Sequence, residues 1–206
     1  MRPMGNRFAD GCVSPPGTTP LIPRRSVLTG LAVGLALRPK LASAHGSIGP
    51  VKPPIAVPDI SVVSNEGFRG PLRERLLGRA TAIQLMFTKC KSICPIEAAT
   101  FARTQEALAG YPSDGIQLLS LSIDPLTDTP DVLKAWLDRL DARPGWTAVS
   151  PVEADLERAR RFFDAASSLG EDHSTAMSLI NRAGLLVWRT VELPAPDEVV
   201  SILKQL

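Results

Sequence analysis

Two cysteines four positions apart, Cys90 and Cys94, are the residues of this sequence best placed for chemistry. They follow the apolar run 82–87, which predicts a buried strand, and Pro95 after the second cysteine favours the first turn of a helix. At a helix N-terminus, backbone N–H groups and the helix dipole stabilise negative charge and lower a thiol pKa. The sequence therefore predicts a thiolate that attacks a disulfide or binds a soft metal.

The N-terminal stretch has the features of an export signal. Arg24 and Arg25 precede an apolar run over residues 27–37, and the small residues 42–44 follow it. This order is typical of a Tat signal over residues 1–44, with cleavage expected after Ala44. Because eleven residues at about 1.5 Å each cannot cross a bilayer core of about 30 Å, we expect a signal rather than an anchor. The exported protein would then be periplasmic.

Export would limit the functions that the cysteines can have. Cys12 would be lost with the signal, which leaves Cys90 and Cys94 in a compartment where disulfides persist. A bridge between these two residues closes too small a loop to add much stability through chain entropy. We therefore expect a redox-active or metal-binding pair rather than a structural disulfide, and the spacing leaves both roles open.

Charge argues against nucleic-acid binding. The formal net charge is +2, and residues 1–44 hold six of the 23 basic residues but one of the 21 acidic ones. The rest of the chain is therefore net negative and has no basic stripe for a phosphate backbone.

The apolar pattern after residue 58 predicts one α/β domain. Residues 45–58 are rich in Pro and Gly and predict an extended lead-in. A redox cysteine motif at a strand-to-helix junction within such a pattern indicates a thioredoxin-like fold over residues 59–206, with a central mixed sheet flanked by helices. Strands are expected at 60–63, 82–87, 116–123, 146–149, 176–180 and 185–191, and helices at 94–109, 130–140, 152–166 and 196–206. Residues 71–77 are expected to form a short helical or loop segment.

His173 is a candidate third ligand. It lies just before the expected strand 176–180, in a segment that follows Gly170. Loops at such junctions often carry ligands that reach across a cleft, and imidazole suits several transition metals. A lone loop histidine that only forms hydrogen bonds is the alternative.

Four blocks of the sequence resemble the motifs of one family. They are Thr88–Pro95 (T-x-C-x-x-x-C-P), Ser122–Pro130 (S-x-D-P-x-x-D-T-P), Pro144–Thr147 and Asp172–Gly184 (D-H-S followed by L-I-N-x-x-G). In this order they resemble the Sco/SenC family of copper-delivery and thiol–disulfide proteins, over roughly residues 57–206. The resemblance implies that Cys90, Cys94 and His173 bind copper, as Cu(I) or Cu(II), with Asp124 as a neighbouring or structural group.

The resemblance also implies a partner. Copper would pass to the binuclear CuA centre of cytochrome c oxidase subunit II, so that the protein acts near the membrane but not in it. The alternative is a thiol–disulfide oxidoreductase in which Cys90 and Cys94 reduce the cysteines of that subunit or of other exported proteins. Two residues depart from the family pattern, Lys91 in place of proline and Ser92 in place of an acidic residue, and the connection before His173 is short.

Overall fold

The computed structural model describes residues 49–111, 115–164 and 175–206. The predicted export signal, Cys12 and His173 lie outside these residues. The described elements are β1 (Gly49–Ala56), β2 (Ser61–Ser64), β3 (Arg69–Pro71), α1 (Leu72–Leu76), β4 (Ala80–Met86), α2 (Cys94–Ala107), β5 (Ile116–Ser122), α3 (Pro130–Arg139), β6 (Trp146–Pro151), the 3₁₀ turn η1 (Glu153–Asp155), α4 (Leu156–Phe163), β7 (Ala176–Ile180), β8 (Leu185–Glu192) and α5 (Pro196–Leu203).

The strands form one mixed sheet in the order β1-β8-β7-β4-β5-β6-β2-β3. β4, β5 and β6 run parallel, because helical crossovers connect them, while the outer strands pair antiparallel. The predicted α/β class with a central mixed sheet flanked by helices is confirmed.

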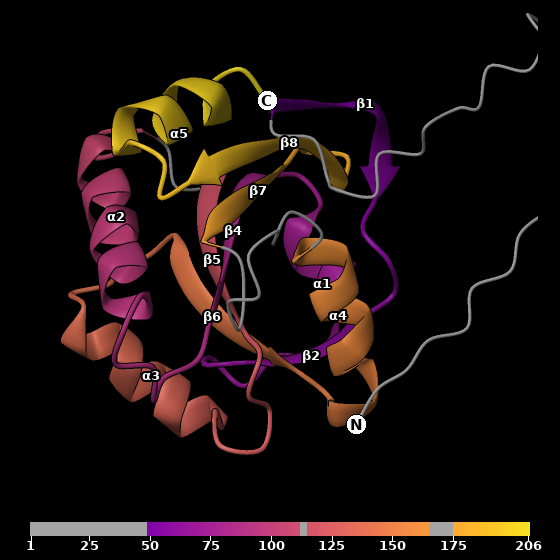
Figure 1. Ribbon diagram of the computed structural model, residues 1–206, viewed down its shortest axis with the longest axis vertical. Helices are drawn as coiled ribbons and strands as arrows, with labels where there is room; N and C mark the ends of the chain where they lie inside the picture. The colour runs from indigo at the N-terminus through magenta and orange to yellow at the C-terminus, as the bar shows by residue number, and fades with distance from the viewer. Residues whose placement is uncertain (1–48, 112–114, 165–174) are drawn as a thin grey trace, which may run out of the picture. The chain divides into compact units, whose positions relative to one another are not determined.

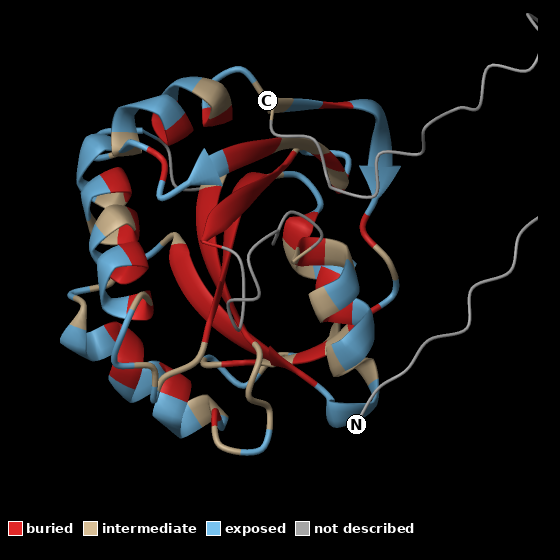
Figure 2. Cartoon of the chain, in the orientation of Figure 1, coloured by how far each residue is buried: buried red, intermediate tan, exposed pale blue. Residues whose placement is uncertain are grey.

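Helices cover both faces of this sheet (Figure 1). α2, α3 and α5 lie on one face, and α1 and α4 lie on the other. Every residue of β4 is buried, and its side chains alternate between two apolar clusters: Ala82 and Met86 pack towards α2, while Ile83 and Leu85 pack towards α1 and α4. Figure 2 shows these central strands as the buried core of the domain.

The strand directions place the segments that carry the candidate site residues at one end of the sheet. The parallel strands β4 and β5 end together, with Met86 level with Ser122. β7 runs antiparallel to β4, so its first residue, Ala176, lies towards this same end. The cysteine loop, the β5–α3 loop and the first residue of β7 therefore lie at the same end of the sheet.

Most predicted elements are present, with three differences. Arg69–Pro71 forms a short strand, β3, that was not expected and pairs with β2. Residues 49–56 of the lead-in form a strand that pairs with β8, which the prolines conceal because they interrupt any alternating pattern. The helix expected over 152–166 instead comprises η1 and a shorter α4, since β6 continues to Pro151. Among the described residues, no helix is both long and apolar enough to cross a membrane.

Candidate functional site

The cysteine loop lies between the end of β4 and the start of α2. The Cys90 N–H donates to the carbonyl of Phe87 at 3.1 Å, which closes a tight turn directly after the strand. α2 then begins at Cys94, and Pro95 occupies its first turn, where a missing N–H costs no helical hydrogen bond. The predicted strand–loop–helix placement of the two cysteines is thus observed.

The two sulfurs are unbridged and hydrogen-bonded to each other. Cys90 is partly exposed, and its Sγ accepts the backbone N–H of Cys94 at 3.4 Å. The Ser92 hydroxyl lies 3.7 Å from the same sulfur. Cys94 is 3% exposed and belongs to the apolar cluster beneath α2. One sulfur therefore faces solvent while the other is part of the core.

This difference in environment separates the two pKa values. Partial burial acts to raise the pKa of Cys90, but hydrogen bonds from the thiol and N–H of Cys94 and from Ser92 outweigh it and lower the pKa to about 6. Burial, followed by the interactions with Cys90, raises the pKa of Cys94 well above that of an ordinary thiol. At neutral pH the pair therefore consists of one thiolate and one buried thiol.

A buried carboxyl group lies close to these sulfurs. Glu97, one turn into α2, is 1% exposed, and its Oε2 has no hydrogen-bond partner. Burial, followed by the negative charges of Cys90 and Glu192, raises the pKa of Glu97 to about 9. The group is therefore a neutral acid at pH 7, and it adds no charge beneath the thiolate.

Two aspartates in the β5–α3 loop differ in what they contact. The Asp124 carboxylate accepts the hydroxyl of Thr127 within its own loop. Asp128 is 1% exposed and instead accepts hydrogen bonds from the backbone and hydroxyl of Thr88 in the cysteine loop. The contact between the two loops therefore runs through Asp128 rather than Asp124.

His173 lies outside the described residues, but the start of β7 is described. The N–H and the hydroxyl of Thr175 both donate to a carboxylate oxygen of Glu192 at the end of β8. This contact fixes the chain two residues after His173, at the sheet edge that carries the cysteines. Within the described ranges, no cluster of three or more His, Cys, Asp or Glu residues could hold a metal ion.

The two departures from the family pattern lie on the surface. Lys91 and Ser92 are both exposed. The Ser92 hydroxyl is close to Cys90 Sγ and helps to stabilise the thiolate, a contact that the sequence did not predict.

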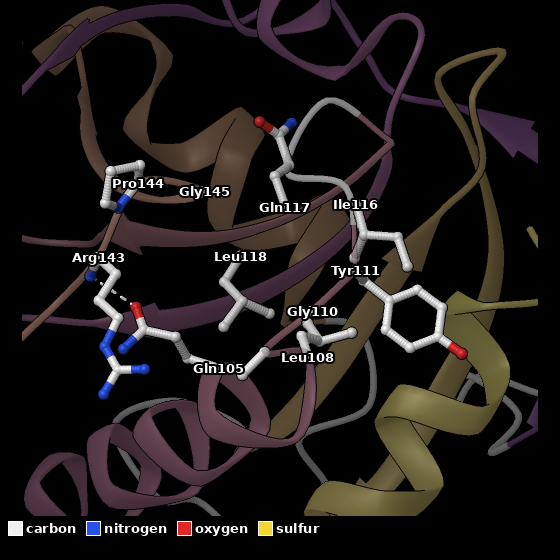
Figure 3. A pocket seen from close by; sticks show the side chains of 11 residues that line it. Gln105, Leu108, Gly110, Tyr111, Ile116, Gln117, Leu118, Arg143, Pro144 and Gly145 are labelled. Atoms are coloured by element: carbon white, nitrogen blue, oxygen red, sulfur yellow. Dashed lines mark hydrogen bonds between the residues drawn. The ribbon is translucent and has the colours of Figure 1, made fainter.

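A separate cavity of about 150 Å³ lies at the opposite end of α2 (Figure 3). Its lining includes Leu108 after α2, Ile116 at the start of β5 and Gly145 before β6. Because the parallel strands β5 and β6 start at this cavity and the cysteine loop lies at the other end of β5, the cavity is not part of the sulfur site.

Sequence reasoning missed three residues near the site: Glu97, Asp128 and Glu192. An acidic residue in the first turn of a helix usually faces solvent, so nothing indicated that Glu97 is buried. Asp128 was given no role of its own, although its place in the S-x-D-P-x-x-D-T-P block was a usable signal. Glu192 follows an apolar strand and gave no signal.

Comparison with known proteins agrees with this architecture. The SCO1/SenC family model matches residues 69–206. A protein of Stutzerimonas stutzeri, to which its name ascribes copper binding, is 28% identical over 121 residues, which are 55% of this chain and 58% of that protein. The chain thus spans little more than half the length of this relative.

Two solved structures share the fold. The copper-bound ScoI of Bradyrhizobium japonicum is 22% identical, with a TM-score of 0.60, over 73% of this chain and 98% of that one. BsSco, described as having a disulfide switch and as a member of the Sco family of cytochrome c oxidase assembly proteins, is 19% identical, with a TM-score of 0.62, over 77% of this chain and 96% of that one. From the matched residues and the shared fold, the chain belongs to the SCO1/SenC family.

Proposed function

We propose that this protein binds copper through Cys90, Cys94 and His173 and delivers it to the CuA centre of cytochrome c oxidase subunit II. The observation that carries the proposal is the pair of unbridged, mutually hydrogen-bonded sulfurs at the start of α2. Copper-bound ScoI and the oxidase-assembly family of BsSco support the choice of metal and of acceptor.

The chemistry of the donor set suits this cargo. Soft thiolates select Cu(I), and an imidazole adds a nitrogen ligand suited to copper. Cys90 is already a thiolate at neutral pH, whereas Cys94 must release a proton when the metal binds, because metal ligands bind deprotonated. Copper would leave by stepwise ligand exchange, in which acceptor thiolates replace the exposed Cys90 before the buried Cys94.

The N-terminal segment supports a periplasmic site of action. We infer that residues 1–44 direct export through the Tat route and that the domain then works on the outer side of the cytoplasmic membrane. In the periplasm the protein could reach the CuA centre of subunit II, the acceptor proposed above.

A thiol–disulfide oxidoreductase is the second candidate, and the low pKa of Cys90 is the observation that favours it. The Cys90 thiolate would attack an acceptor disulfide to form a mixed disulfide and release one acceptor thiolate. Cys94 would then lose its proton and attack Cys90 Sγ, which leaves a Cys90–Cys94 disulfide and a fully reduced acceptor. This route does not use His173.

Copper titration of the reduced, full-length chain tests the proposal. Cu(I) and Cu(II) would be added in competition with chelators to the wild type and to Cys90→Ser, Cys94→Ser and His173→Ala. Cys12→Ser is the matched control, because it removes a thiol from the predicted signal and leaves the site intact.

The proposal predicts one tightly bound copper per chain in the wild type and in Cys12→Ser. Tight binding is lost in Cys90→Ser and Cys94→Ser and weakened in His173→Ala. No tight copper in the wild type, or equal binding in all variants, would contradict it. An easily reduced Cys90–Cys94 disulfide that is indifferent to His173→Ala would then favour the oxidoreductase.

A further inference from the structure

The carboxylate of Asp128 is buried between the β5–α3 loop and the cysteine loop. It accepts the Thr88 N–H at 3.1 Å from one oxygen and 3.4 Å from the other, the Thr88 hydroxyl at 2.5 Å and the Ser122 hydroxyl at 2.6 Å. Thr88 and Asp128 are 40 residues apart in the chain. A buried carboxylate with several donors in place is a strong and well-defined anchor.

The contact with Thr88 acts on the turn that carries Cys90. The Thr88 N–H and the Phe87 carbonyl belong to the same planar peptide group. Asp128 holds this group at its N–H, and the Cys90 N–H donates to its carbonyl at 3.1 Å. The rotation of one rigid plane is therefore fixed from both sides, and its orientation determines where the Cys90 backbone lies.

The same segment reaches Cys94. The backbone of Phe87 forms a hydrogen bond with the Cys94 sulfur, and the Cys94 N–H donates to Cys90 Sγ. A rotation of the peptide group that Asp128 holds would disturb both contacts. Hydrogen bonds linked in this way polarise one another, so the loss of one weakens the next.

We propose that Asp128 is a positioning residue that holds the Phe87–Thr88 peptide group and so fixes the two cysteine sulfurs in the geometry that binds copper. The inference rests on the proposed function for its copper readout. Asp128 does not touch either sulfur in the described contacts and acts through Thr88. Groups that orient metal ligands in this way typically contribute about 10- to 100-fold in metal affinity.

The first test compares Asp128→Ala with Asp128→Asn. Alanine removes every acceptor, whereas the asparagine oxygen still accepts the Thr88 N–H and its amide can donate to Ser122. We expect Cu(I) affinity to fall roughly tenfold or more in Asp128→Ala and to return to within about threefold of the wild type in Asp128→Asn. Unchanged affinity in a folded Asp128→Ala would overturn the proposal.

A matched pair covers the case in which Asp128→Ala does not fold. Thr88→Val and Ser122→Ala each remove one hydroxyl that donates to the same carboxylate, but only Thr88 lies in the cysteine loop. The proposal predicts a clearly larger loss of Cu(I) affinity for Thr88→Val than for Ser122→Ala. Equal effects of the two, or none in Thr88→Val, would show that Asp128 only stabilises the fold.

A copper-free measurement separates this inference from the proposed function. The equilibrium between the Cys90–Cys94 dithiol and its disulfide is measured in glutathione buffers. Because a loosened loop no longer stabilises the reduced pair, Asp128→Ala should shift this equilibrium severalfold towards the disulfide, and Ser122→Ala should shift it less. If the wild type binds no copper, the proposed function fails. The dithiol–disulfide equilibrium then tests by itself whether Asp128 positions the two cysteines. A wild-type equilibrium in Asp128→Ala would then refute the inference.

Discussion

At the scale of single residues, the two cysteines are chemically distinct. Both lie at the start of α2, as the sequence predicts, yet only Cys90 has the lowered pKa expected of that position. Sequence reasoning treated the sulfurs alike because spacing shows proximity to a helix N-terminus but not burial. Cys94 is enclosed by the apolar cluster beneath α2, where a charge is costly. An asymmetric pair follows, with an exposed nucleophile and a buried partner.

This asymmetry predicts the pH dependence of alkylation. Only the thiolate reacts, so modification of Cys90 by iodoacetamide should reach half its maximal rate near pH 6. Cys94 should stay unmodified throughout the neutral range. Site-resolved mass spectrometry of the reduced chain measures both residues, and Ser92→Ala should move the Cys90 midpoint upwards. A Cys90 midpoint near 9, the value of an unperturbed thiol, would contradict the account.

A second prediction concerns Glu97 and the stability of the fold. Since the pKa of Glu97 is raised from 4.5 to about 9, the folded chain keeps a proton that the unfolded chain releases between these values. The free energy of unfolding contributed by this group therefore falls as pH rises through that window. In Glu97→Gln this pH dependence, up to about 1.4 kcal/mol of unfolding free energy per pH unit, should be absent. The stability of the variant relative to the wild type should therefore be higher at pH 8 than at pH 5.

Urea unfolding between pH 5 and 8 measures this difference. Glu106→Gln is the control, because Glu106 lies on the same helix but is exposed. Its pH profile should run parallel to that of the wild type. Parallel profiles for Glu97→Gln as well would mean that the Glu97 carboxyl ionises normally in the folded protein.

At the scale of elements, the sequence predicted the strands and helices whose apolar pattern was clear. β4 and β5 are buried on both faces, and their short apolar runs, bounded by turn residues, predict strands at the right places. The start of α3 at Pro130 was also predicted, although the residue before it, Thr129, makes no capping hydrogen bond through its side chain. β1 was not predicted as a strand, because only its pairing with β8 makes a Pro-rich segment part of the sheet.

The contact between the cysteine loop and the β5–α3 loop could not be predicted either. It depends on the register of two parallel strands, which places Met86 level with Ser122 and so brings Thr88 near Asp128. The resemblance drew attention to Asp124 instead, because family motifs mark positions but not the contacts that each one makes.

The helix that carries Cys94 depends on its aromatic contact with the sheet. Phe101 is fully buried and meets Trp146 edge-to-face, with ring centroids 5.6 Å apart. Phe101→Ala should lower the free energy of unfolding by about 3–5 kcal/mol, measured by urea denaturation, because it leaves a cavity beneath α2. Ile96→Ala on the same helix, at a site 52% exposed, should change it by less than about 0.5 kcal/mol. Similar losses for both would show that α2 is not held through this contact.

At the scale of the whole molecule, the packed core and the candidate site occupy different parts of the fold. The helices pack on the central strands through two apolar clusters, while the sulfurs and Asp128 lie in the loops and at the helix start at one end of the sheet. The cavity at the far end of α2 lies away from the candidate site. A partly exposed thiolate at the end of the sheet suits transfer to another protein, because an acceptor can reach Cys90 without opening the core.

Transfer is therefore the most direct test of the account. The full-length chain loaded with Cu(I) would be mixed with the soluble domain of a cytochrome c oxidase subunit II whose cysteines are reduced, and the CuA absorption would be followed over time. The account predicts that CuA forms as copper leaves the wild-type chain, and that a Cys90→Ser chain supports no transfer. If copper stays bound, while the reduced chain instead opens a disulfide in the oxidised acceptor, the protein is a reductase and not a copper donor.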